Sequence, residues 1–167
     1  MKKLLILIAA TTLVAFKFPN ERFVAKDKGF SIAIPEGYEM KKDYDQMIPV
    51  MMLSPMESDK DNFRENINVA TEPFVGSSSS YSLANLNEMK TALTDFNLLK
   101  TGTKQVGDLT AYWFVYTFSY KEFKMQNLVY CFAFNGNGYG VTCSASTETF
   151  DKYKKIFEET AESFKKE

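Results

Sequence analysis

The 167-residue chain contains no histidine, and this absence excludes several kinds of site. Histidine is the side chain that most readily exchanges protons near neutral pH, and it is the commonest metal ligand. A Ser-His-Asp triad, a Cys-His pair and a histidine-based metal centre are therefore all excluded. The sequence also lacks a glycine-rich phosphate loop and the loop spacing of a calcium site. We expect a protein that is not an enzyme, with no catalytic residue and no cofactor.

Clustered charge of one sign is also scarce. The chain has 20 Lys and Arg against 21 Asp and Glu, a formal net charge of −1, with no basic stripe. Nucleic acids and anionic membranes are recognised through clustered positive charge, so neither is an expected partner. Several acids share one segment with basic residues, which is typical of a solvated loop: Glu57, Asp59, Lys60, Asp61, Arg64 and Glu65.

The N-terminus has the pattern of a secretory signal peptide. Lys2 and Lys3 precede an apolar run over 4–16 that is too short for a membrane-spanning helix. No cysteine follows this run, so the lipid-attachment residue of a bacterial lipoprotein is missing. We predict a signal peptide over 1–15 and a single mature domain over 16–167. The mature protein is expected in the periplasm or outside the cell, without a stable membrane anchor.

Alternation of apolar and polar residues predicts strands in the first half of the chain. In "NINVATE", Ile67 and Val69 point to one face, while Asn66 and Asn68 point to the other. By the same pattern we expect strands over 23–26, 30–34, 48–53 and 66–72, with a turn at 27–29 between the first two.

A helix is predicted next, with Ser82 as its N-cap. Tyr81 and Leu86 would then pack together as a hydrophobic staple at the start of the helix. Apolar residues at spacings of three and four define its buried face: Leu83, Leu86, Met89, Leu93 and Phe96.

The second half predicts a four-stranded antiparallel meander followed by a helix. The expected strands cover 103–106, 111–120, 125–134 and 139–146, and their connections are too short for parallel crossovers. The final helix begins after a cap at Ser146 or Thr147 and has apolar residues at helical spacing from Phe150 to Phe164. The fold class is α+β, with an antiparallel sheet of seven or eight strands packed between helices.

The strand "AYWFVYTFSY" carries aromatic residues on one face. If that face were open, it would be a platform for a peptide, glycan or lipid. Two amphipathic helices and one sheet favour one helix on each face, so we expect a helix to cover it. The residues concerned are Tyr112, Phe114, Tyr116, Phe118 and Tyr120.

The order of these segments resembles the PsbP-like superfamily, which includes DcrB-like bacterial envelope proteins. The resemblance rests on "GFSIAIPEGYEM", "FRENINVATE", the helix after Ser82, the strand from Ala111, "YGVTCSAS" and "FDKYKKIFEETAESF". Tyr38 occupies the position after the "P-x-G" turn where the family usually has tryptophan. The resemblance implies an α/β/α sandwich and a role in binding or assembly rather than catalysis. It supplies no catalytic residues.

Four methionines within ten positions have one chemical interpretation, because thioethers are soft ligands suited to Cu(I). Adjacent residues of a strand point to opposite faces, so Met51 and Met52 would not converge without help from neighbouring loops. We therefore favour ordinary packing over a copper site at Met47, Met51, Met52 and Met56.

The two cysteines, Cys131 and Cys143, stand on opposite arms of a hairpin around "NGNG". A turn of three or five residues centred on Asn137 would place them opposite each other on one face of the sheet, and this is the expected register. A four-residue turn would put them on opposite faces. An oxidising compartment permits a disulfide between facing cysteines, but buried cysteines often remain unpaired, so the sequence leaves the bond open.

Three classes of function follow. The first is a secreted, non-enzymatic binding or assembly accessory whose partner is an unknown protein or envelope component. The second is a carrier of a small apolar ligand or metal, with a pocket near the methionine-rich strand. The third is a hydrolase with two carboxylates in a cleft. We favour the first, because the sequence contains no motif that supports the other two.

Overall fold

The computed structural model describes residues 21–58 and 63–167, so the predicted signal peptide over 1–15 lies outside the described residues. The strands in chain order are β1 (Arg22–Ala25), β2 (Phe30–Ala33), β3 (Glu39–Lys42), β4 (Val50–Leu53), β5 (Asn66–Pro73), β6 (Thr94–Val106), β7 (Leu109–Tyr120), β8 (Phe123–Phe134), β9 (Asn137–Ser146) and β10 (Lys165–Lys166). The helices are α1 (Ser78–Ala92) and α2 (Phe150–Glu162). Neither helix is long and apolar enough to cross a membrane.

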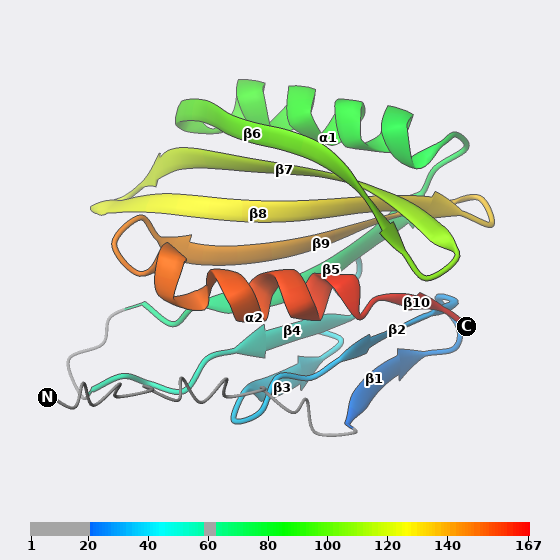
Figure 1. Ribbon diagram of the computed structural model, residues 1–167, viewed down its shortest axis with the longest axis horizontal. Coiled ribbons are helices and arrows are strands. Elements are labelled where there is room, and N and C mark those ends of the chain that lie inside the picture. The colour runs from blue at the N-terminus through cyan, green and yellow to red at the C-terminus, as the bar shows by residue number, and fades with distance from the viewer. Residues whose placement is uncertain (1–20, 59–62) are drawn as a thin grey trace, which may run out of the picture.

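Antiparallel pairing joins the strands into two sheets (Figure 1). The large sheet has seven strands in the order β3-β4-β5-β9-β8-β7-β6, and the small sheet has the order β1-β2-β10. Strands β6 to β9 pair with their sequence neighbours and form the predicted meander. The predicted fold class, an antiparallel sheet with helices on its faces, is confirmed.

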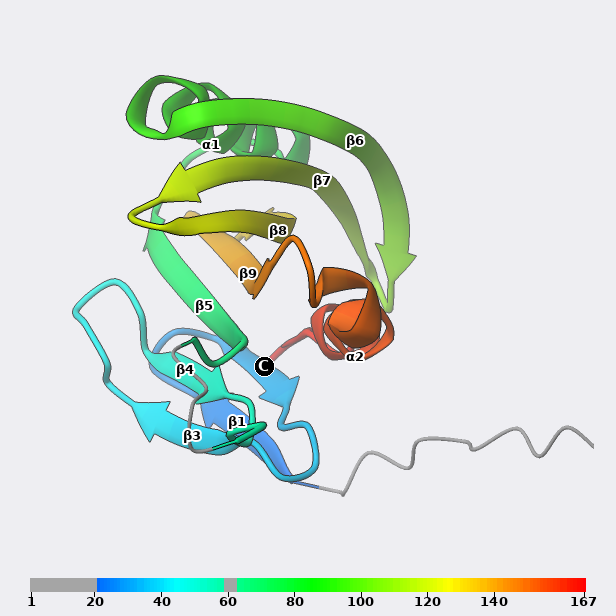
Figure 2. The ribbon, with the colours of Figure 1, turned by 90° about the vertical axis from the view of Figure 1, so that its left-hand side faces the viewer.

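Different elements cover the two faces of the large sheet. Helix α1 packs on one face over β7 and β8, while α2 and the small sheet cover the other face and enclose the main core. Because successive residues of a strand alternate, Phe114 and Tyr116 lie under α1, whereas Trp113 and Val115 face α2. Figure 2 shows β6 and β7 curving over the side on which α2 lies.

The aromatic face of β7 is covered, as predicted. Phe114 and Tyr116 are 1% and 2% exposed, and residues of α1 such as Leu86 and Met89 pack against the same cluster. The face is therefore part of the core and not an open platform, although Tyr120 at the end of the strand remains exposed.

Helix α1 begins earlier than predicted. Its N-cap is Ser77, whose hydroxyl accepts a hydrogen bond from the Ser80 backbone N–H, while the Ser80 hydroxyl accepts one from the Ser77 backbone N–H. This reciprocal capping box satisfies two backbone donors and starts the helix within the serine run. The prediction of Ser82 as N-cap is therefore wrong, and Tyr81 lies inside the helix, where it is buried rather than forming a staple before it.

The cysteine hairpin has a different register from the predicted one. Phe134 pairs with Asn137, so the turn contains only Asn135 and Gly136, both with positive φ, at 51° and 76°. A two-residue turn of this kind matches the twist of the strands and favours Asn-Gly. As a result, the partner of Cys143 is Leu128, and the partner of Cys131 is Gly140.

The expected facing of Cys131 and Cys143 is thus wrong. Cys131 lies in the cluster under α1, while Cys143 lies in the main core on the opposite face. Both are free thiols and both are buried. A bond between them would require the hairpin to change its register by an odd number of residues.

Candidate binding cleft at the end of the sheet

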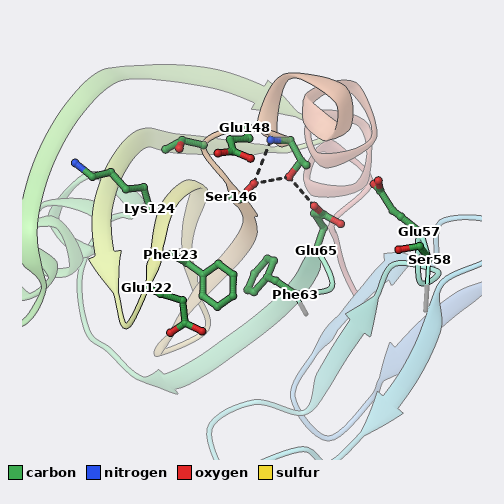
Figure 3. A pocket seen from close by; sticks show the side chains of 11 residues that line it. Glu57, Ser58, Phe63, Glu65, Glu122, Phe123, Lys124, Ser146 and Glu148 are labelled. Atoms are coloured by element: carbon green, nitrogen blue, oxygen red, sulfur yellow. Dashed lines mark hydrogen bonds between the residues drawn. The ribbon is translucent and has the colours of Figure 1, made fainter. Parts of the chain in front are cut away.

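A cleft of about 670 Å³ opens at one end of the large sheet (Figure 3). Three connections meet there: the segment between β4 and β5, the turn between β7 and β8, and the turn between β9 and α2. We call it the end cleft. Its lining residues are Glu57, Ser58, Phe63, Glu65, Glu122, Phe123, Lys124, Ser146, Thr147, Glu148 and Thr149.

Glu65 is the most deeply placed acid of the end cleft, with only 2% of its surface exposed. Its Oε1 accepts a hydrogen bond from the Thr149 hydroxyl at 2.6 Å, and its Oε2 accepts one from the Ser54 hydroxyl at 3.2 Å. The Ser54 backbone N–H also donates to the Glu65 carbonyl oxygen at 2.8 Å. Both carboxylate oxygens are thus engaged within the protein, as a buried charge requires.

The carboxylate of Glu65 lies at the N-terminus of α2. Thr149 is the N-cap residue of this helix, but its hydroxyl donates to Glu65 and does not cap a backbone N–H. The Thr149 backbone N–H donates to the Ser146 hydroxyl at 3.2 Å, which fixes the turn between β9 and α2. A negative charge at a helix N-terminus interacts favourably with the helix dipole. Glu65 therefore fastens the start of β5 to the start of α2.

Two phenyl rings form the apolar part of the end cleft. Phe63 precedes β5 and Phe123 begins β8, and their ring centroids are 5.8 Å apart with a tilted arrangement. Figure 3 shows the two rings side by side between the carboxylates. Both residues are half-buried.

The remaining charges differ in how they are paired. Glu57 accepts hydrogen bonds from the Lys152 ammonium and the Tyr153 hydroxyl of α2. Partial burial, together with this bond to a carboxylate, raises the pKa of Tyr153. Among the described residues, Glu122 and Glu148 form no ion pair, so their exposed carboxylates remain available to a basic partner.

This arrangement is suited to binding more than to catalysis. A general base must reach the reacting group, but the Glu65 carboxylate is buried and already accepts two side-chain hydrogen bonds. The other groups that line the end cleft include two half-buried phenyl rings and the exposed carboxylates of Glu122 and Glu148. Within 21–58 and 63–167, no group of three or more acids and cysteines is arranged to hold a metal ion.

The methionine segment lies elsewhere. Met52 is fully buried in the main core, and Met51 points to the opposite face of β4. Met47 and Met56 are 49% and 57% exposed in the flanking loops. The four sulfurs are therefore divided between two faces and the surface, and none of these residues lines the end cleft.

Sequence reasoning missed the end cleft. Glu57 and Glu65 were expected in a solvated loop; this holds for Glu57, which is exposed, and is wrong for Glu65, which is buried. Glu65 directly precedes the alternating strand β5, and its spacing of two from the buried Ile67 is the one signal that its side chain points inward.

Comparison with known families identifies the chain. The family model described as PsbP matches residues 20–166. The chain belongs to the PsbP family. No curated protein matches it in sequence. The resemblance drawn from the sequence motifs is therefore confirmed.

Solved structures with the PsbP fold are similar over most of the chain. The cyanobacterial PsbP, CyanoP, of Synechocystis sp. PCC 6803 has a TM-score of 0.64 and 15% identity, covering 88% of this chain and 92% of that chain. LpqN of Mycobacterium tuberculosis, described as involved in cell envelope biogenesis, has a TM-score of 0.63 and 11% identity, covering 86% and 88%. PA94 of Pseudomonas aeruginosa, a protein of unknown function described as a putative regulator, has a TM-score of 0.62 and 11% identity, covering 86% and 94%.

Proposed function

We propose that this PsbP-family protein is an exported, non-enzymatic binding or assembly accessory that holds a segment of a partner protein in its end cleft. The observation that carries the proposal is the composition of the end cleft. The half-buried rings of Phe63 and Phe123 lie together in it. The exposed carboxylates of Glu122 and Glu148 line the same cleft and form no ion pair with any residue of 21–58 and 63–167. Such a surface is complementary to an extended segment with apolar and basic side chains.

Family membership and the N-terminal sequence support the same proposal. Members of the PsbP family are generally accessory proteins and not enzymes. Lys2, Lys3 and the apolar run that follows fit an exported protein.

Export predicts that intact-mass measurement of the envelope or extracellular fraction finds a chain beginning between Leu13 and Lys17. A full-length chain retained in the cytoplasmic membrane would contradict export.

The cleft itself is tested by photo-crosslinking in cells of the source organism. A benzophenone amino acid replaces Lys124, an exposed residue that lines the end cleft, and, as a control, Val75, which is 96% exposed before α1. We expect a discrete cross-linked protein from position 124 and not from position 75. Identical patterns from both positions would contradict binding at the cleft.

A pair of charge reversals tests the role of the free carboxylates. Glu148→Lys places a positive charge on the rim, whereas Glu88→Lys makes the same change on the exposed surface of α1. We expect Glu148→Lys to abolish the cross-link from position 124 and Glu88→Lys to leave it unchanged. Equal loss in the two variants would show that overall charge, not the end cleft, determines the interaction.

A further inference from the structure

A second cavity, of about 330 Å³, is lined by residues of β6, β7, β8 and α2. In Figure 2 the ribbons of β6 and β7 curve over the side on which α2 lies. We call this cavity the α2 groove. It shares no lining residue with the end cleft. Its volume is at the lower end of the range typical of small-molecule sites. Its apolar floor consists of Trp113, Val115, Leu128, Tyr130 and Phe150.

Trp113, the only tryptophan of the chain, lies across Gly102 on the neighbouring strand. A Cβ atom at Gly102 would lie 2.4 Å from Cζ2 of the indole, so any larger residue there would displace the ring. The missing side chain of Gly102 thus creates the space in which the indole rests. Trp113 remains only partly buried and contributes a flat apolar surface to the α2 groove.

Lysines of β6 stand on both sides of this glycine. Because alternate residues share a face, Lys100 and Lys104 point to the same side of the sheet as Gly102, and both line the α2 groove. The Lys104 ammonium is 3.1 Å from Oε1 of Glu162, which also accepts a hydrogen bond from the Tyr130 hydroxyl. Lys104 therefore already has a carboxylate partner.

Within 21–58 and 63–167, Lys100 has no such partner. Helix α2 contributes Lys154 and Glu158 to the groove, and these two pair with each other at 3.9 Å. Among the described residues, no carboxylate lies within ion-pairing distance of the Lys100 ammonium. The α2 groove thus combines a flat apolar floor with two internally paired acids and one unpaired cation.

We propose that the α2 groove binds a small molecule with a flat apolar body and one carboxylate, with Trp113 contacting the body and Lys100 the carboxylate. The paired Glu158 and Glu162 at the α2 side disfavour a second negative charge on the ligand. The unpaired Lys100 favours one charge over none. This site is independent of the proposed role of the end cleft.

Trp113 provides the measurement, because the intrinsic tryptophan fluorescence of the protein comes from the α2 groove alone. The probe is 4-phenylbutyrate, compared with the neutral amide 4-phenylbutanamide and the cation 4-phenylbutylamine. We expect a saturable change with the carboxylate, binding about tenfold weaker for the amide, and no saturable change with the amine. Absence of a saturable change with the carboxylate, or equal binding of the three compounds, would overturn the proposal.

A pair of matched variants tests the role of Lys100 in binding the carboxylate. Lys100→Met keeps the aliphatic stem and removes the charge, whereas Lys42→Met makes the same change on β3 at the opposite edge of the large sheet. We expect Lys100→Met to weaken binding of 4-phenylbutyrate about tenfold and Lys42→Met to leave it unchanged. Unchanged binding in Lys100→Met would overturn the assignment of the carboxylate to this lysine.

The glycine under the indole gives a second test that retains the fluorescent reporter. Gly102→Ala displaces the indole, and we expect loss of the saturable response together with a shifted emission of the free protein. Circular dichroism verifies that the variant is folded. Wild-type affinity in a folded Gly102→Ala variant would contradict the assignment of Trp113 as the contact for the ligand body.

Discussion

The hydroxyl of Thr149 donates a hydrogen bond to Oε1 of Glu65 at 2.6 Å, across 84 residues of sequence. This bond joins the first residue before α2 to the residue before β5, and thereby holds two walls of the end cleft together. The Thr149 hydroxyl therefore makes a tertiary contact and does not cap a backbone N–H of α2.

Thr149→Val should therefore destabilise the protein. The substitution keeps the shape of the side chain but removes one donor to a buried carboxylate, which costs about 1 to 3 kcal/mol of unfolding free energy. Urea unfolding followed by circular dichroism measures the change. The control is Thr147→Val, an exposed position in the same turn, which should be close to neutral. Equal effects at the two positions would show that the hydrogen bond contributes no stability.

The start of α1 gives a second stability prediction. Ser77→Ala removes the side chain that accepts from the Ser80 N–H and should cost about 1 kcal/mol. Ser79→Ala changes an exposed serine of the first turn and should be neutral or slightly stabilising, because alanine is the better helix former. Thermal unfolding of the two variants distinguishes them. A larger loss in Ser79→Ala would show that the helix starts elsewhere.

Periodicity predicted the elements whose residues alternate or repeat clearly. Strands β7 and β8 are long and rich in aromatic and β-branched residues, and α2 buries Phe150, Phe157 and Ala161 at helical spacing. These patterns follow from which face of each element is buried, and a single stretch of sequence contains that information.

Where one element continues the burial pattern of another, the sequence could not separate them. Phe96 follows the helical spacing of α1 but belongs to β6, because Asp95 adopts a positive φ of 55° and redirects the chain. Its ring still stacks on Tyr116, 5.1 Å away, in the cluster under α1. Phe96 therefore packs under α1 as part of a strand, and the positive φ at Asp95 produces no periodic signal in the sequence.

The sequence also could not predict features that depend on contacts between distant segments of the chain. Strand β3 reads "EMKK", has no alternating apolar pattern, and forms only because β4 offers it a partner. Its Lys41 and Lys42 are exposed at the edge of the large sheet, where charge discourages pairing with other chains. The burial of Glu65 and the position of Trp113 over Gly102 likewise depend on contacts between segments far apart in the chain or on separate strands.

We predict that the four methionines do not form a copper site. Because Met51 and Met52 point to opposite faces of β4, we expect no stoichiometric Cu(I) binding in a titration against a competing chelator. Tight binding of one equivalent that is lost in the quadruple Leu variant would contradict this. The substituted positions are Met47, Met51, Met52 and Met56.

The thiols should be free and protected in the folded protein. Cys131 and Cys143 are both fully buried on opposite faces of the sheet, and burial raises the pKa of each thiol. Because the thiolate is the reactive form, alkylation by iodoacetamide should be slow in the native protein and rapid in urea. Mass spectrometry counts the added groups. Secreted protein that gains none after denaturation without a reductant would be disulfide-bonded and would contradict the register.

The raised thiol pKa also makes stability depend on pH in a defined direction. Burial raises the pKa of Cys131 from 9.0 to about 12, so between these values the unfolded chain loses a proton that the folded protein keeps. Ionisation therefore favours the unfolded state, and the stabilising contribution of the buried thiol decreases as pH rises above 9.

Cys131→Ala lacks this group and should lose less stability over the same range. We expect the difference in unfolding free energy between the wild type and Cys131→Ala to shrink by about 1 kcal/mol between pH 8 and pH 10. Urea titrations at the two pH values measure it, and the comparison with the variant cancels the contribution of the tyrosines. A difference that stays constant or widens would show that Cys131 ionises as readily in the folded protein as in the unfolded chain.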